Sequence, residues 1–183
     1  MTVGLIILGI IVLLAIIIVG IFNKLAKQKV MVEEASSDIE TFLKQRYDMI
    51  PNLVEIVKGY AKHEKETFEK ITEMRAKAMG TESFAEKAKI EDQISGAISK
   101  IFAVAENYPE LKANTNFLDL QGTLKELEDG IQKSRRYYNG SVRDFNQMIV
   151  VFPTNIIANI LKFKAFPFFE ASEEEQKNVE IKF

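Results

Sequence analysis

His63 is the single histidine of the 183-residue chain, and its surroundings begin like a metal-binding motif. It opens the stretch HEKET, which starts like the H-E-x-x-H signature, in which two histidines hold zinc and the glutamate acts as a general base. Thr67 occupies the position of the second histidine, and the chain has no cysteine. A zinc site needs three or four such ligands. We therefore expect no metal and no cofactor, and we interpret His63, Glu64 and Glu66 as part of a solvated helix face.

Two groups of polar residues that stand among apolar ones are better candidates for a functional surface. This candidate interaction surface consists of Arg46, Tyr47, Asp48 and Asn52, followed later in the chain by Arg135, Arg136 and Asn139. Arg135 and Arg136, which stand beside two tyrosines, are suited to gripping a phosphate or a carboxylate. The alternatives are structural: Asp48 and Asn52 would satisfy free N–H groups at helix ends. Arg135 and Arg136 would form ion pairs and hydrogen bonds between helices.

Signatures of other enzyme classes do not occur. The phosphate-binding motif G-x-x-x-x-G-K-[ST], the dinucleotide motif G-x-G-x-x-G and the hydrolase motif G-x-S-x-G are all missing. The 24 lysines and arginines nearly balance the 26 aspartates and glutamates, whereas a nucleic-acid-binding surface needs a basic excess. These observations favour a protein that is not an enzyme and does not bind nucleic acid.

The first 23 residues carry no charged side chain, and Lys24 is the first charged residue. About 20 apolar residues in a helix are enough to cross a bilayer. A cleaved signal peptide would have a charged n-region and a shorter apolar core. We expect residues 1–23 to form an uncleaved transmembrane anchor. Because Lys24, Lys27 and Lys29 follow it, the positive-inside rule predicts a cytoplasmic domain and a short N-terminus outside.

Residues 24–162 are predicted to form a helical domain. Apolar residues recur there at spacings of three and four in four successive segments, the longest running from Phe117 to Ile149. Caps are expected at Ser83 with Glu86 and at residues 114–116, and a short extra helix at residues 156–161. Short connections between long amphipathic helices predict an all-α fold, an antiparallel up-and-down four-helix bundle behind the transmembrane helix.

The first break in this pattern lies at Ile50-Pro51-Asn52. Two interpretations compete: a turn between two helices, or one long helix kinked at Pro51. The turn is favoured because a residue before proline avoids the helical conformation. Asn52 with Glu55 also resembles a capping box that would begin a new helix.

Residues 163–183 are predicted to form a Phe-rich and acidic tail, a loop with a short extended piece. Its aromatic and basic residues are a candidate membrane-interface segment: Phe163, Lys164, Phe166, Phe168 and Phe169. The rings would insert into the bilayer and the lysines would meet the headgroups. Alternatively, the rings pack back on the ends of the bundle.

Three long stretches resemble the LemA family. They are RYDMIPNLVEIVKGYAKHE (46–64), AVAENYPELKANTNFLDLQ (103–121) and SRRYYNGSVRDFNQMIVVFPTNIIANILKFKAFPFFEA (134–171). The resemblance implies a bacterial or archaeal single-pass membrane protein with a helical-bundle domain and no established catalytic activity. Family gene neighbourhoods imply a TPM-domain protein or a membrane protease as a partner.

Together these features predict a membrane-anchored helical scaffold or adaptor of the prokaryotic cell envelope, located in the plasma membrane. Its exposed helix faces would recruit a protein partner or another copy of the chain, and confinement to the membrane raises the effective concentration of both. The alternative is a sensor or regulatory subunit of an envelope or membrane-proteostasis system. An enzyme is the least expected class, because no site is evident.

Overall fold

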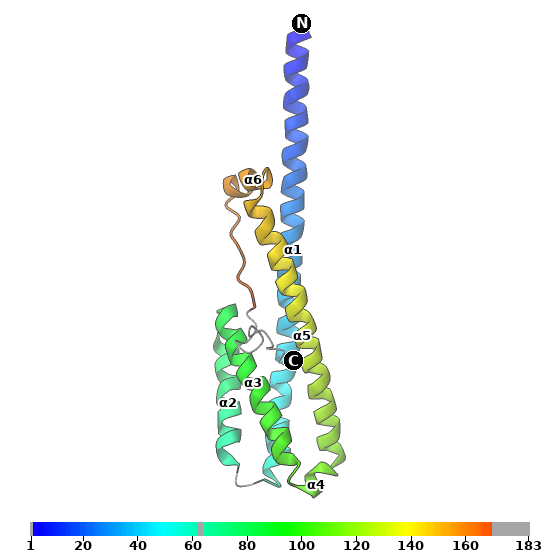
Figure 1. Ribbon diagram of the computed structural model, residues 1–183, viewed down its shortest axis with the longest axis vertical. Helices are drawn as coiled ribbons and strands as arrows, with labels where there is room; N and C mark the ends of the chain where they lie inside the picture. Colours follow the sequence, from blue (N-terminus) through cyan, green and yellow to red (C-terminus); the bar gives the residue numbers. More distant parts are fainter. Residues whose placement is uncertain (1, 62–63, 170–183) are drawn as a thin grey trace, which may run out of the picture. The chain divides into compact units, whose positions relative to one another are not determined.

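The computed structural model describes residues 2–61 and 64–169 (Figure 1). His63 and the acidic part of the tail lie outside the described residues. The helices are α1 (Thr2–Lys58), α2 (Lys65–Gly80), α3 (Phe84–Ala105), α4 (Pro109–Lys112), α5 (Thr115–Val150) and α6 (Thr154–Ile160). No strand occurs in the described part of the chain, which confirms the all-α class. The antiparallel order of a four-helix bundle stays a prediction.

The chain divides into two compact units, which are described separately. The first unit comprises Met1–Ser37 with Tyr137–Pro167, and the second comprises Asp38–Arg136 with Phe168–Phe183. One boundary between the units falls within α1 and another within α5, so each of these helices contributes residues to both units.

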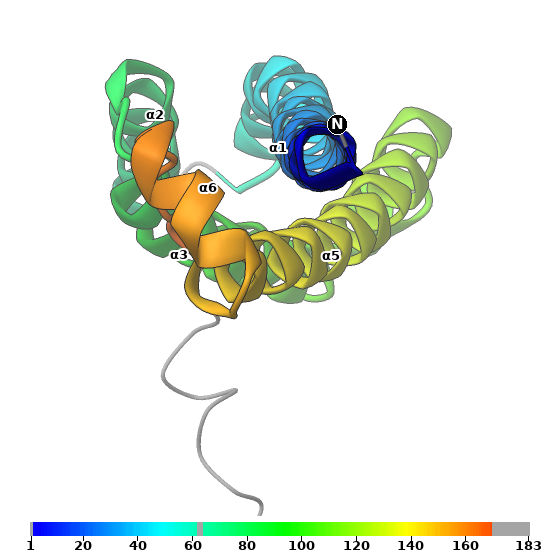
Figure 2. The ribbon, with the colours of Figure 1, turned by 90° about the horizontal axis from the view of Figure 1, so that it is seen from above.

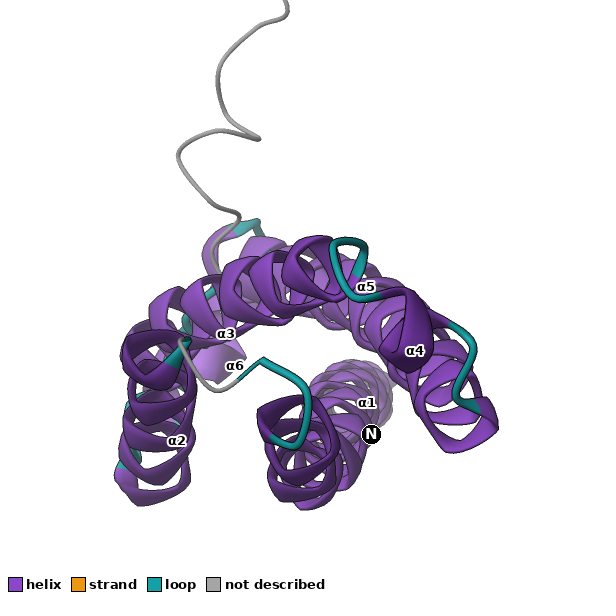
Figure 3. Ribbon diagram, turned by 90° about the horizontal axis from the view of Figure 1, so that it is seen from below, coloured by secondary structure: helices purple, strands orange, loops and turns teal. Residues whose placement is uncertain are grey.

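In the second unit, α2, α3 and the first part of α5 follow one another around the second part of α1 (Figures 2 and 3). Its core consists of the apolar stripes that the sequence predicts. The largest fully buried apolar side chains there include Ile39, Leu43, Ile50, Leu53, Ile71, Ile94 and Ile101. Burial of these stripes, rather than helix propensity alone, stabilises the helices.

The predicted turn at Pro51 is wrong, because α1 continues through it to Lys58. Proline has no N–H to donate to the carbonyl four residues earlier, which here belongs to Tyr47. That carbonyl instead accepts a hydrogen bond from Nε of Arg75 on α2, at 2.7 Å. The hydrogen bond lost to Pro51 is thus replaced from a neighbouring helix. The predicted capping box at Asn52 is also wrong, since no helix begins there.

The other predicted boundaries fall close to the observed ones. The Ser83 hydroxyl accepts a hydrogen bond from the Glu86 N–H, at 3.4 Å, at the start of α3. Oδ1 of Asn114 accepts one from the Phe117 N–H, at 3.2 Å, at the start of α5. The predicted short helix at residues 156–161 is observed as α6. The short α4 was not predicted.

In the first unit, α6 and the end of α5 pack against α1. Leu25, Ile157 and Ala158 form a small buried cluster, with Ile21, Met148, Ile149 and Phe163 packed against it. The N-terminal part of α1 is different, because its large apolar side chains from Val3 to Val19 are 46–67% exposed. Among the described residues, α1 alone contains a stretch long and apolar enough to cross a membrane, with a mean hydropathy of 3.5 and none of it buried.

Candidate functional site

A buried ion pair joins α1 to α3 in the second unit. Arg46 and Glu91 are each only 1% exposed, and Nη2 of Arg46 donates to Oε2 of Glu91. The Tyr47 hydroxyl donates to the other oxygen, Oε1. Both oxygens of this carboxylate are therefore satisfied by neighbouring residues of the motif that begins with Arg46.

The second Arg46 nitrogen extends the network to α5. Nη1 donates to Ser95 Oγ at 2.8 Å and to Oε2 of Glu128. The Ser95 hydroxyl donates to the same Glu128 oxygen, at 3.0 Å, and Gln132 donates to Oε1, at 3.2 Å. We call Arg46, Tyr47, Glu91, Ser95 and Glu128 the Arg46 cluster. It connects three helices through one guanidinium group.

Burial determines the electrostatics of the cluster. Burial holds the pKa of Tyr47 far above its usual value, and the negative charge of the neighbouring Glu91 carboxylate is the second largest cause. The hydroxyl therefore keeps its proton and remains a donor. A buried carboxylate is costly unless it is paired, and here it has an arginine and a phenol. The arrangement satisfies charge within the protein and leaves neither oxygen of Glu91 for a ligand.

Arg135 forms a second buried contact with α3, at Asp92, the residue that follows Glu91. It is 6% exposed, and Nη2 donates to Oδ1 of Asp92 at 2.8 Å. Its guanidinium carbon lies 4.5 Å from the centre of the Phe169 ring. Phe169 in turn meets the edge of Phe84 at 4.9 Å and is fully buried. Arg46 and Arg135 thus dock on successive carboxylates of α3.

The remaining residues of the candidate interaction surface are not members of the Arg46 cluster. Asp48, Asn52 and Arg136 are exposed, and Asn139 is half-buried. The capping role considered for Asp48 and Asn52 is wrong, because α1 does not end near them. For Arg135, the structural alternative of pairing between helices is what the structure shows. Arg46 also pairs between helices, which the sequence did not predict.

Part of the candidate membrane-interface segment is hydrogen-bonded to α5 and packs on it within the first unit. Asn146 donates to the Phe166 carbonyl and accepts from its N–H, both at 2.9 Å. The Tyr138 hydroxyl donates to the Pro167 carbonyl at 2.8 Å, and burial raises the pKa of Tyr138 to about 12. The Phe163 and Phe166 rings meet the edge of Phe145, at 6.1 and 5.2 Å.

The five residues of that segment therefore differ in their surroundings. Phe163 and Phe166 are half-buried on α5, and Phe169 is buried in the second unit. Lys164 and Phe168 are exposed, Phe168 by 45%. Insertion of this segment into a membrane stays a prediction, and the rings with fixed protein contacts have less apolar surface to contribute to it.

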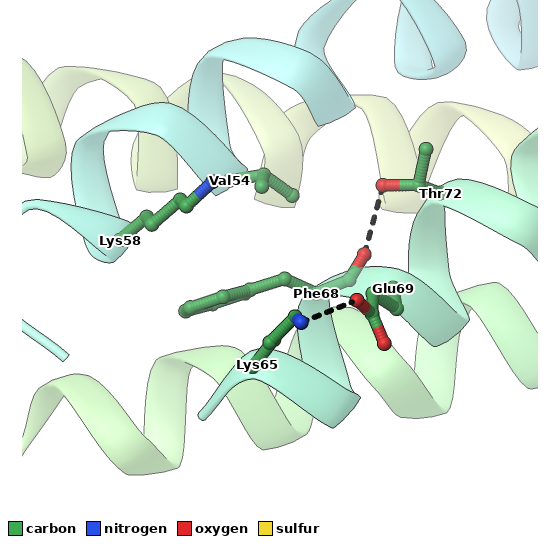
Figure 4. Close-up of a pocket in the computed structure, with 6 residues that line it drawn as sticks. All are labelled: Val54, Lys58, Lys65, Phe68, Glu69 and Thr72. Carbon is green, nitrogen blue, oxygen red and sulfur yellow. Dashed lines mark hydrogen bonds and ion pairs between the residues drawn. The ribbon is translucent and has the colours of Figure 1, made fainter. Parts of the chain in front are cut away.

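A cavity of about 520 Å³ lies between the end of α1 and α2 (Figure 4). Three of its polar side chains have partners: Lys65 pairs with Glu69 at 3.5 Å, and the Thr72 hydroxyl donates to the Phe68 carbonyl at 2.8 Å. Within residues 2–61 and 64–169, no group of three His, Cys, Asp or Glu side chains is placed to hold a metal ion.

Comparison with known proteins decides the family. The model of the LemA family matches residues 35–183. The chain belongs to the LemA family. It is 33% identical to Protein LemA of Metamycoplasma hominis over 167 residues, which cover 88% of this chain and 74% of that protein. The whole Arg46 cluster falls within the matched residues, and most of the exposed apolar part of α1 precedes them.

Magnetosome proteins share a shorter stretch with this LemA-family chain. Magnetosome protein MamQ 2 of Paramagnetospirillum magneticum is 31% identical over 74 residues, which are 40% of this chain and 27% of that protein. Magnetosome protein MamQ of Magnetospirillum gryphiswaldense is 27% identical over 73 residues, with the same shares. The matched stretch thus spans about a quarter of these relatives.

Sequence reasoning identified the arginines of this LemA-family chain but missed their partners Glu91, Asp92 and Glu128, and also Arg75. One signal was available for Glu91. It lies three and seven residues before Ile94 and Ile98, on the apolar stripe of α3. A carboxylate on an apolar helix face needs a buried cation from another helix. Arg46 lies in the same way between Leu43 and Ile50 on α1.

Proposed function

We propose that this LemA-family protein is a membrane-anchored helical scaffold that has no catalytic activity. One observation supports it above all: the N-terminal part of α1 exposes an unbroken apolar surface that nothing in the described chain covers. Soluble proteins rarely expose an apolar surface of this size to water. A lipid bilayer accommodates such a surface, because a helix satisfies its own backbone and its apolar side chains match the lipid tails.

The helical domain presents surfaces rather than a reaction site. Both terminal nitrogens of Arg46, the Tyr47 hydroxyl and Nη2 of Arg135 make contacts within the protein. The exposed motif residues Asp48, Asn52 and Arg136 remain for contacts with other molecules. In this proposal they bind a protein partner or another copy of the chain. Confinement to the membrane lets weak contacts suffice, because it raises the effective concentration of the partner.

The proposal includes an orientation and a topology. Lys24, Lys27 and Lys29 follow the apolar segment, and the positive-inside rule then places the helical domain in the cytoplasm of a prokaryotic cell, at the plasma membrane. The long helices would form an antiparallel up-and-down bundle behind the anchor.

Proximity labelling from the C-terminus of the full chain in living cells tests the scaffold. We expect a reproducible set of labelled proteins, or labelling between copies. The set should shrink when Asp48, Asn52 and Arg136 are replaced by alanine. It should persist when the equally exposed Lys100, Glu106 and Lys125 are replaced. Identical label sets for both triple variants, or substrate turnover by the purified full chain, would contradict the proposal.

A further inference from the structure

The corner between α5 and α6 exposes a second apolar surface. We call residues 150–161 the α6 corner. Its exposed apolar side chains are Val150, Val151, Phe152, Ile156, Ile160 and Leu161, of which Phe152 is exposed by 78% and Ile160 by 68%. The other face of α6, with Ile157 and Ala158, is buried. α6 therefore has apolar side chains on both faces, with Asn159 also on the exposed one, and within the described residues only one of the two faces is covered.

The covered face marks where this corner lies along α1. Ile157 and Ala158 pack on Leu25, and Ile21 packs against the same cluster. Ile21 belongs to the charge-free segment, and Leu25 follows directly after Lys24. The α6 corner thus lies beside α1 at the end of its charge-free segment (Figure 1). In a chain anchored by that segment, this is the level where a bilayer passes from lipid tails to headgroups.

Basic residues accompany the apolar surface. Between residues 150 and 169 the only charged side chains are Lys162 and Lys164, with no aspartate or glutamate. These two lysines, with Lys29 of α1, line a cavity of about 370 Å³ whose walls include the Phe145, Phe163 and Phe166 rings. Lys29 also pairs with Glu33 at 3.1 Å. Ammonium groups beside aromatic rings match the phosphate and the upper acyl chain of an anionic lipid.

We propose that the α6 corner rests in the bilayer interface beside the anchor, and that Lys29, Lys162 and Lys164 bind the headgroups of anionic lipids. This inference rests on the anchoring proposed above. It differs from the interface segment predicted from sequence, because most of the inserting side chains belong to residues 150–161 rather than to the phenylalanines that follow. The chain would touch the bilayer twice, once across it and once along its surface.

Fluorescence quenching by brominated lipids tests this arrangement in the full chain. Because the chain has no cysteine, one cysteine can carry an environment-sensitive fluorophore at a chosen position. We would label Ile160→Cys in the α6 corner, Ile10→Cys in the anchor and Glu34→Cys as a solvent control. Glu34 is exposed on α1 and lies nine residues beyond Leu25, about 13 Å along the helix. Each protein is reconstituted in vesicles of phosphatidylcholine, with and without phosphatidylglycerol.

We expect lipid quenching of the labels at Ile10 and at Ile160 and none at Glu34. The label at Ile10 should lie deeper in the bilayer than the label at Ile160. Phosphatidylglycerol should increase the quenching at Ile160, and Lys162→Gln with Lys164→Gln should remove that increase. Quenching at Ile10 but not at Ile160 would overturn the inference while leaving the anchor intact. Absence of quenching at Ile10 would overturn the anchoring itself.

A second measurement separates the bilayer from a protein occupant. If the α6 corner binds another copy of the chain instead, Ile160→Cys should form disulfide-linked dimers under mild oxidation and should escape lipid quenching. That result would overturn the inference. Monomeric protein with quenched Ile160 supports it.

Discussion

Two parts of the same helix, α1, have opposite relations to their surroundings. From Val3 to Val19 its large side chains are apolar on every side and exposed. From Asp38 to Lys58 apolar side chains face the core, and polar ones such as Asp48 and Asn52 face outward. The same backbone geometry therefore serves a segment that is apolar on every face and a segment that has one face toward water and the other toward the protein core.

The two parts also treat charge differently. The first part excludes it altogether, whereas the second buries Arg46 and surrounds it with Glu91, Ser95 and Glu128. A buried charge is tolerated where partners from other helices are fixed in place. The comparison teaches that the second part of α1 can bury a charged side chain because neighbouring helices supply partners for it. The experiments below change one part and use the other as its control.

The largest expected effect follows from charging the first part. Ile7→Arg, Ile11→Arg and Leu14→Arg together should oppose membrane insertion by about 8–10 kcal/mol. The full chain should move from the carbonate-resistant membrane fraction to the soluble fraction. Arginines at Glu55, Glu73 and Glu82, which are exposed in the second unit, should leave it in the membrane. If the first triple variant stays membrane-bound, lipid does not surround this part of α1.

Removing the buried cation from the second part should have the next largest effect. Arg46→Met leaves the Glu91 carboxylate buried with only Tyr47 as a partner, and should lower the free energy of unfolding by about 3–5 kcal/mol. Urea unfolding of the full chain in detergent micelles, followed by circular dichroism, measures it. The exposed Arg136→Met is the matched control, expected within about 0.5 kcal/mol of the parent.

A double variant distinguishes pairing from simple packing. Arg46→Met with Glu91→Met replaces both charges by apolar side chains, so most of the lost stability should return. A double variant as unstable as Arg46→Met alone would show that the cluster does not act as a charge pair.

Removing the hydrogen bond that compensates for Pro51 should lower the free energy of unfolding by a smaller amount. Arg75→Met leaves the Tyr47 carbonyl without its donor and should cost about 1.5–3 kcal/mol. In a Pro51→Ala background the alanine N–H can donate to that carbonyl, so the same Arg75→Met change should cost clearly less. Urea unfolding of the four proteins gives the coupling energy. If Arg75→Met lowers the free energy of unfolding equally in both backgrounds, the Arg75 hydrogen bond does not compensate for Pro51.

The smallest effect concerns alkaline pH. The folded-state pKa of Tyr47 is raised by burial and by Glu91, so the unfolded chain releases the phenol proton first. The stability that Tyr47 contributes is complete below the usual tyrosine pKa of about 10 and is lost as the pH rises above it, by at most about 1.4 kcal/mol per pH unit. Tyr47→Phe should lessen this slope in unfolding measured from pH 9 to 11. Tyr137→Phe, an exposed change, should not alter it.

Sequence patterns with a local cause predicted much of the structure. The apolar stripes, the Ser83 cap, the Asn114 cap and α6 all depend on residues within a few positions of one another. The composition of the charge-free segment likewise predicted a helix long and apolar enough to cross a membrane, and its role as an anchor stays a prediction. The stripes, the caps and α6 are predicted correctly because neighbouring residues determine them.

Features that depend on distant residues were not predicted. Pro51 does not end α1, because Arg75, 24 positions later, supplies the missing hydrogen bond. The partners of Arg46 lie 45 and 82 positions away. Packing of the phenylalanines after α6 on the protein was one of two predicted alternatives, but the residue that fixes the backbone of Phe166, Asn146, was not predicted. A single sequence shows which residues need a partner, but packing decides which partner each receives.

Cysteine accessibility along α1 tests most directly whether lipid surrounds its first part. Single cysteines at Ile10, Ile17, Phe22, Lys27 and Glu34 in the full chain are exposed positions, and each would be treated with a membrane-impermeant maleimide in intact and in permeabilised cells. The account predicts no labelling from Ile10 to Phe22 under either condition, and labelling of Lys27 and Glu34 after permeabilisation only. Labelling at Ile10 and Ile17 as fast as at Glu34 would contradict it.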